Sequence, residues 1–107
     1  MNKTVNILGT KYNIIEDDAL IRQGFDGVHE YYENSISVRP VQNMLSSDKP
    51  DSAKELRYKE CLRHELIHAF FSESGLDNYS SNEELVDWLA MQFPKIVKVF
   101  EELGVLC

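Results

Sequence analysis

Residues 64–68 read His-Glu-Leu-Ile-His in the middle of an otherwise apolar stretch, residues 62–71. Such a stretch is expected to face a hydrophobic core, where imidazoles and a carboxylate are costly unless each finds a partner. On a helix, His64 and His68 lie one turn apart on the same face, so their side chains can converge on one point. The stretch therefore predicts a mostly buried helix whose polar side chains need a binding partner.

The spacing of this motif is typical of a zinc site. Two neutral imidazoles one helical turn apart are a ready pair of zinc ligands. Glu65 is turned by about one hundred degrees from His64, so it lies beside the metal position without binding the metal. In the H-E-x-x-H arrangement this carboxylate is the general base toward a metal-activated water. We therefore predict that His64 and His68 bind Zn²⁺ and that Glu65 is catalytic.

A zinc site needs a third protein ligand, and the segment NEELVDWLA, residues 82–90, offers the best candidate. On a helix Glu83 and Asp87 face the same way, so Glu83 can bind the metal while Asp87 accepts a hydrogen bond from a ligating histidine. Whether Glu83 or its neighbour Glu84 is the ligand depends on where this helix begins. We predict a capping box between Ser81 and Glu84, which leaves Glu83 free to bind the metal.

Two other third ligands are less favoured but stay open. His29 falls on an expected strand, where a lone histidine is more often a surface or packing residue. Cys61 would make a closed, structural type of site that leaves Glu65 unused, so we expect it to be a packing residue. The metzincin pattern is excluded, because it requires a glycine and a histidine where this chain has Phe71 and Ser74.

The sequence before the motif predicts strands. Two segments of alternating apolar residues, residues 4–16 and 25–40, are each interrupted by turn residues. They predict a small antiparallel sheet of three to four strands, with a first hairpin that turns at Gly9 and Thr10. Residues 46–52 are polar and rich in helix breakers, so we expect a loop between the sheet and the helices.

Capping signals predict where the helices begin and end. Ser52 and Glu55 fit a capping box at the start of the motif helix, and Gly75 fits the left-handed residue after its end. A second helix should begin near residues 80–82, and Pro94 should either bend it or open a third helix. A stripe of apolar residues at helical spacing is expected to face the core: Leu85, Leu89, Phe93, Ile96, Phe100 and Leu103.

Together these elements predict one α+β domain over residues 1–107, with a small sheet, a central motif helix and one or two further helices. The formal net charge of −7, from 18 acidic and 11 basic residues, opposes binding to nucleic acid phosphates. No apolar run is long enough to cross a membrane, and the N-terminus has no signal-peptide pattern. Two cysteines are too few for a disulfide framework, so we expect a cytoplasmic protein.

The metal motif and the segment that follows it resemble a known family. His64, Glu65 and His68 are followed, after 14 intervening residues, by Glu83, with Val86, Asp87, Leu89 and Ala90 behind it, in a pattern that runs over residues 63–96. This arrangement is similar to that of the ImmA/IrrE-type metallopeptidases, and most similar to their short phage and prophage members. The resemblance implies a minimal zincin-like domain with bound Zn²⁺, acting on a protein or peptide substrate in a bacterial cell.

Two functions follow from this pattern. The first is a zinc metalloendopeptidase with Glu65 as the general base. The alternative is a catalytically silent zincin-fold interaction module of phage or prophage origin, in which zinc is structural and the acidic surface docks a protein. A length of 107 residues leaves little chain for a long substrate cleft, which favours the module. Glu65 favours the enzyme, because a structural zinc site needs no base beside it.

Overall fold

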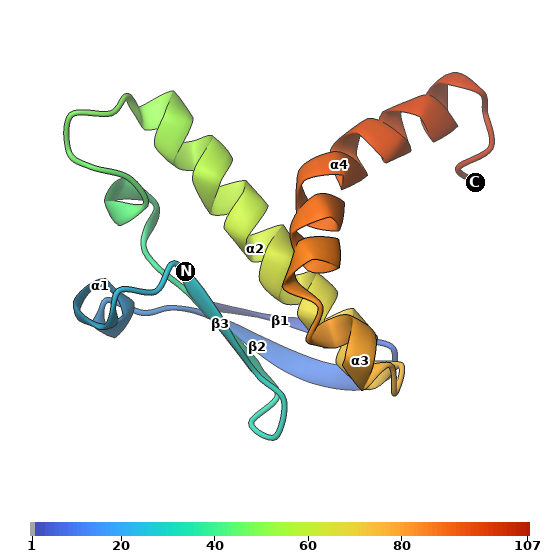
Figure 1. The fold of residues 1–107 in the computed structure, drawn as a ribbon, viewed down its shortest axis with the longest axis horizontal. Helices are drawn as coiled ribbons and strands as arrows, with labels where there is room; N and C mark the ends of the chain where they lie inside the picture. Colours follow the sequence, from blue (N-terminus) through green and yellow to red (C-terminus); the bar gives the residue numbers. More distant parts are fainter. Residues whose placement is uncertain (1) are drawn as a thin grey trace.

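A four-stranded sheet forms the first part of the computed structural model, which describes residues 2–107 (Figure 1). Its strands are β1 (Asn2–Ile7), β2 (Thr10–Glu16), β3 (Gly27–Glu30) and β4 (Ser35–Val38), in the spatial order β1-β2-β4-β3. The predicted first hairpin is confirmed, but its turn is at Leu8 and Gly9, one residue earlier than predicted, and Thr10 already belongs to β2. Both turn residues have positive φ, 51° and 95°, which suits the twist of two antiparallel strands.

The sheet is mixed, so the prediction of an antiparallel sheet is wrong at its centre. β2 pairs with β4 in parallel, whereas β4 pairs with β3 in antiparallel fashion. The cause is a short helix that was not predicted, α1 (Ala19–Gln23), which carries the chain away from the end of β2. The chain then forms β3 at the edge of the sheet and returns as β4 between β3 and β2.

The motif lies on the long helix α2 (Asp51–Glu73), which packs along one face of the sheet (Figure 1). The predicted capping box of Ser52 and Glu55 is wrong. The helix begins at Asp51, so both residues lie inside it, and Pro50 occupies the capping position without a side-chain hydrogen bond. The predicted end is confirmed, because Gly75 follows the helix with φ of 75°.

The hydrophobic core lies between α2 and the sheet. On α2, the buried residues Cys61, Glu65 and Ala69 follow one another at four-residue spacing and mark the line of the helix that faces the sheet. Glu65 therefore belongs to the core-facing side of α2. The apolar members of the core cluster are Ile7, Tyr12, Ile14, Ile36, Val38, Met44, Cys61 and Ala69.

Two further helices follow, α3 (Asp77–Ser80) and α4 (Glu83–Glu102). The first half of α4 packs on α2 and buries Val86 and Ala90, and after Pro94 the helix bends and projects away from the rest of the molecule (Figure 1). Proline lacks the N–H that would bond to the Ala90 carbonyl. Arg63 Nε donates to this carbonyl at 2.7 Å instead. Pro94 therefore bends one helix and does not open a third.

The predicted core stripe along α4 is wrong over its second half. Phe100 and Leu103, which follow Pro94, are 42% and 72% exposed. The periodicity of these residues is real, but this part of the helix extends beyond α2 and has no core to face (Figure 1). None of the helices in the described part of the chain has the combination of length and apolar character that spanning a bilayer requires.

Candidate metal centre

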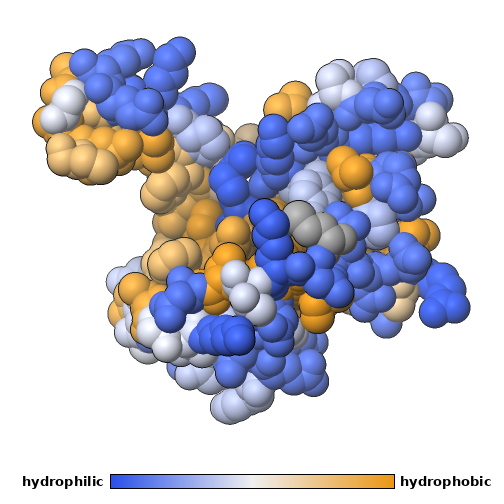
Figure 2. Space-filling view, turned by 180° about the vertical axis from the view of Figure 1, so that it is seen from behind, coloured by the Kyte–Doolittle hydropathy of each residue, from blue (hydrophilic) through white to orange (hydrophobic). Residues whose placement is uncertain are grey.

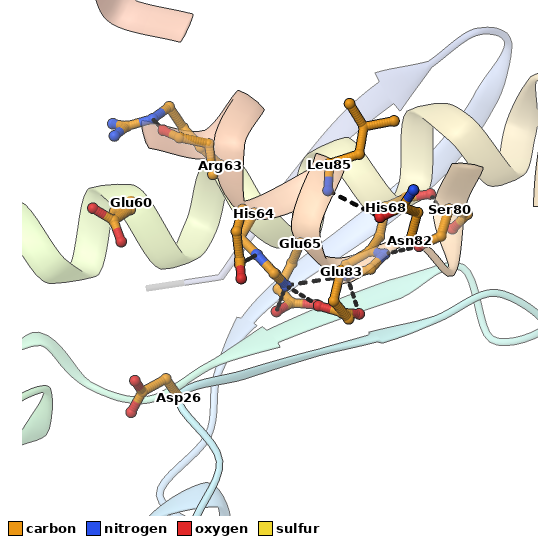
Figure 3. Close-up of polar contacts among 12 residues, drawn as sticks. Asp26, Glu60, Arg63, His64, Glu65, His68, Ser80, Asn82, Glu83 and Leu85 are labelled. Carbon is orange, nitrogen blue, oxygen red and sulfur yellow. Dashed lines mark hydrogen bonds and ion pairs between the residues drawn. The ribbon is translucent and has the colours of Figure 1, made fainter. Parts of the chain in front are cut away.

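The side chains of His64, His68 and Glu83 meet where α2 and α4 are in contact (Figure 3). The Nε2 atoms of the two histidines are 3.1 Å apart. Glu83 lies 3.2 Å from His64 Nε2 through Oε2 and 3.0 Å from His68 Nε2 through Oε1. In a tetrahedral zinc site, with bonds of about 2.0–2.1 Å, neighbouring donor atoms are roughly 3.3 Å apart. The three predicted ligands thus have nearly the spacing that one small metal ion requires.

Hydrogen bonds determine which nitrogen of each imidazole is free. His68 Nδ1 is 2.6 Å from the Ser80 carbonyl oxygen, which can only accept, so Nδ1 carries the proton. His64 Nδ1 is 2.8 Å from Asp87 Oδ1 and donates in the same way. In the neutral rings, both Nε2 lone pairs then face one position that they share with the Glu83 carboxylate. Electron pairs gathered in this way repel unless a cation or a proton lies between them, so the donor set fits a metal ion.

The start of α4 differs from the prediction. Asn82 caps the helix, and its side chain accepts a hydrogen bond from the Leu85 N–H at 3.1 Å. The predicted capping box of Ser81 and Glu84 is therefore wrong. The Ser81 hydroxyl instead donates to the Asp77 carbonyl at 3.0 Å, at the end of α3.

Of the two adjacent glutamates, Glu83 lies with the histidines and Glu84 does not, as the sequence predicts. Glu83 is the first residue of α4, and its carboxylate lies against the two histidines. Glu84 is exposed and lines a surface hollow together with Trp88 and Met91. Asp87, one turn after Glu83, reaches His64 from the same helix face, as the spacing predicts.

Glu65 lies beside this donor group without belonging to it. It is 7% exposed, and its Oε2 is 3.8 Å from His64 Nε2. Gly27 of β3 allows this close packing, because a β-carbon there would lie 3.0 Å from Glu65 Cγ and 2.9 Å from Cys61 Sγ. Burial, together with the charges of Glu83 and Asp87, raises the pKa of Glu65 to about 7. A carboxyl with this pKa can both accept and donate a proton near neutral pH.

A polar cleft of about 260 Å³ opens beside Glu65. Its lining includes His64 and Glu65 as well as charged residues of α2 and of the segment before β3. Among these, Arg57 donates to Asp26 Oδ2 at 2.7 Å and to Glu60 Oε1 at 3.0 Å. The cleft therefore gives solvent and small polar groups access to the position beside the Glu65 carboxylate.

His29 and Cys61, the two alternative ligands, both lie outside the donor group. The His29 ring stacks on His68 with centroids 6.3 Å apart, and its Nε2 is 3.3 Å from the Tyr12 hydroxyl. Burial lowers the pKa of His29, which favours the neutral ring. Cys61 is buried against Gly27, and burial raises the pKa of its thiol to about 12.

Three features of the site were missed in the sequence. Gly27 is one of the turn residues in the predicted strand segment 25–40, but a glycine beside a strand can also mark the close approach of another element. The Ser80 carbonyl is a backbone group, so no residue type signals its role. The Tyr12 hydroxyl, which also lies near His29, donates a hydrogen bond to Glu73 Oε2 at 2.8 Å. These two residues are 61 positions apart, and only the fold brings them together.

Comparison with protein-family models, curated proteins and solved structures finds no match for this chain. The resemblance of residues 63–96 to the ImmA/IrrE-type metallopeptidases therefore stays a prediction.

Proposed function

We propose that the protein is a zinc-dependent peptidase with a minimal zincin-like fold, in which His64, His68 and Glu83 bind the metal and Glu65 is the general base. The observation that carries this proposal is a buried carboxylate beside a group of three metal donors but outside it. Three protein ligands leave a fourth position open, which is the pattern of catalytic zinc sites. Two imidazoles and a carboxylate at tetrahedral spacing also suit zinc chemically.

The proposed mechanism assigns a task to each residue around the donor group. When bound, zinc supplies a Lewis acid that lowers the pKa of a water molecule toward about 7 and polarises a peptide carbonyl. Glu65, buried beside the donor group but outside it, would accept a proton from a water molecule at that position and deliver a proton to the leaving amine. Asp87 and the Ser80 carbonyl hold the imidazoles in the tautomer that presents Nε2.

The surroundings support an extended peptide as the substrate. β3 is an edge strand, and no strand among residues 2–107 pairs with its outer side. It runs along the motif, with Gly27 packed against Glu65 and His29 stacked on His68. A peptide that adds to this edge as a further strand would pass close to the donor group.

Cleavage of a complex peptide mixture tests the proposal. Wild type, Glu65→Gln and Glu84→Gln would each be loaded with zinc and incubated with peptides from a bacterial proteome, and new peptide termini would be identified by mass spectrometry. Glu84→Gln is the matched control, because it removes the same charge from the neighbouring exposed glutamate. We expect cleavage by wild type and by Glu84→Gln, and none by Glu65→Gln at full zinc content.

Two results would contradict the proposal. One is wild type that binds zinc but cleaves no peptide, which favours the interaction module with a structural metal. The other is equal cleavage by wild type and Glu65→Gln, which would remove Glu65 from the chemistry.

A further inference from the structure

An apolar groove of about 350 Å³ lies between α2 and the first half of α4. It shares no lining residue with the polar cleft beside Glu65. Two of its aromatic side chains, Phe70 and Phe93, are 46% and 47% exposed. Arg63 is the one charged residue of the lining, and the apolar lining residues are Leu66, Ile67, Phe70, Phe71, Leu89 and Phe93.

The projecting end of α4 carries a matching apolar ridge. We call residues 95–106, which follow Pro94, the arm. Ile96, Val99, Phe100 and Leu103 recur along the arm at the spacing of one helix face. Val99 is 51% and Leu103 72% exposed. Figure 2 shows the arm from behind, with one apolar side that continues into the apolar surface at its base.

The arm cannot fill the groove of its own chain. Phe93 in the groove and Phe100 on the arm belong to the same helix, and the bend between them turns the arm away from α2 (Figure 1). The bond from Arg63 to the Ala90 carbonyl, 2.7 Å long, supports this bend at Pro94. Folding the arm back onto the groove would therefore require α4 to break.

We propose that a second copy of the chain covers this surface, with the arm of each copy lying in the groove of the other. The groove and the apolar ridge cannot meet within one chain, but the ridge of one copy can lie in the groove of another. The exchange is symmetric, so both contacts form together in a closed two-fold dimer. The proposal concerns the surface away from the cleft and does not depend on peptidase activity.

The size and charge of the surface fit this occupant. The exposed apolar side chains of the groove and the arm are Phe70, Phe93, Val99, Phe100, Leu103, Val105 and Leu106. With the exposed parts of all these side chains fully covered, each copy would bury at most roughly 700 Å², near the ~800 Å² per partner of stable interfaces. A copy carries a net charge of −7, which opposes association, but the lining of the groove contains no acidic residue. We therefore expect the dimer to tighten as added salt screens the repulsion.

Sedimentation velocity and light scattering over a wide range of chain concentrations test the dimer. The variants are Phe70→Glu in the groove, Phe100→Glu on the arm and, as the matched control, Leu56→Glu. Leu56 is 69% exposed on α2 and lies outside the groove. We expect wild type and Leu56→Glu to form dimers, and each phenylalanine variant to raise the dissociation constant by at least about tenfold. Circular dichroism checks that every variant is folded.

Mixing the two phenylalanine variants tests the exchange itself. Phe70→Glu keeps an intact arm and Phe100→Glu keeps an intact groove, so an equimolar mixture can form one wild-type contact and should associate more tightly than either variant alone. A mixture no tighter than its components would overturn the proposal. Wild type that stays monomeric at all concentrations would also overturn the proposal. This holds as well if the monomer binds lipid vesicles through these side chains.

Discussion

Asp87 Oδ1 lies 2.8 Å from His64 Nδ1, while His64 Nε2 faces the position that it shares with His68 and Glu83. One residue of α4 thus orients a ring whose other nitrogen is available to a metal. The carboxylate accepts the Nδ1 proton, so it fixes the tautomer and the orientation of the His64 ring. Asp87 is therefore a positioning residue for the proposed metal centre.

Substituting Asp87 by asparagine should weaken zinc binding without abolishing it. The asparagine oxygen can still accept a hydrogen bond from Nδ1, but the negative charge is lost. We therefore expect zinc affinity to fall by about 10–100-fold, the usual effect of changing a hydrogen-bond partner of a metal ligand. Calorimetric titration of zinc into the metal-free protein measures the effect. Unchanged affinity would show that Asp87 does not act through His64.

The two adjacent glutamates should differ sharply in the same titration. Glu83→Ala removes a donor atom that lies 3.0 Å from His68 Nε2, and zinc affinity should fall by orders of magnitude. Glu84→Ala removes an exposed side chain next to it and should leave zinc affinity intact. A large loss in Glu84→Ala with little change in Glu83→Ala would mean that the ligand is assigned to the wrong residue.

Gly27→Ala should disturb Glu65 while leaving the donor group in place. The new β-carbon would meet Cys61 Sγ at 2.9 Å and Glu65 Cγ at 3.0 Å, so we expect a loss of about 1–3 kcal/mol in the free energy of unfolding. Zinc content should stay at the wild-type level, and any peptidase activity should fall. Chemical denaturation and metal analysis measure the two effects separately.

A second background tests the cause of this loss. In Glu65→Ala the contact with Cγ is removed and the contact with Cys61 Sγ remains, so Gly27→Ala should cost less there than in the wild type without becoming neutral. Equal costs in both backgrounds would show that the loss comes from Cys61 and not from Glu65.

Glu73 should contribute an acid-sensitive part of the stability. Its carboxylate accepts hydrogen bonds from Thr10 at 2.5 Å and from Tyr12 at 2.8 Å, which lower the pKa of Glu73. A folded-state pKa below the ordinary value of 4.5 stabilises the fold above that pH, and the contribution disappears as the pH falls through the folded-state pKa. These bonds connect β2 to the end of α2.

The free energy of unfolding of wild type and Glu73→Gln should therefore differ most near neutral pH. The difference should shrink as the pH falls below about 4.5, because both side chains are then uncharged. Both proteins keep the residues of the proposed metal centre, so the pH dependence of these residues cancels in the difference. A difference that is constant across this range would contradict the assigned role.

Local sequence pattern predicted the donor group because its geometry is mostly local. A spacing of four residues on a helix fixes the relation of His64 to His68, and the same rule relates Glu83 to Asp87. Glu83 was chosen for the wrong reason, since Asn82 and not Ser81 caps α4. Moving the start of the helix by one residue did not change which side chain faces α2.

The errors arose where distant parts of the chain decide the structure. Alternating strands predicted a sheet, but the parallel pairing of β2 with β4 depends on α1, a five-residue helix with no strong periodicity. The apolar stripe of α4 indicated an amphipathic helix correctly. Periodicity does not show which surface, if any, covers such a stripe. Phe100 and Leu103 lie beyond the part of α4 that packs on α2, and their side chains are exposed.

The most direct test of the central claim is zinc binding by the wild-type chain together with its effect on unfolding. Zinc would be titrated calorimetrically into metal-free wild type and His68→Ala, and thermal unfolding would be followed with zinc and with chelator. We expect one zinc per wild-type chain, a clearly higher unfolding midpoint with zinc than with chelator, and neither effect in His68→Ala, because metal that binds the folded site stabilises the fold. Wild type without stoichiometric zinc, or with the same midpoint in zinc and in chelator, would contradict a metal centre at His64, His68 and Glu83.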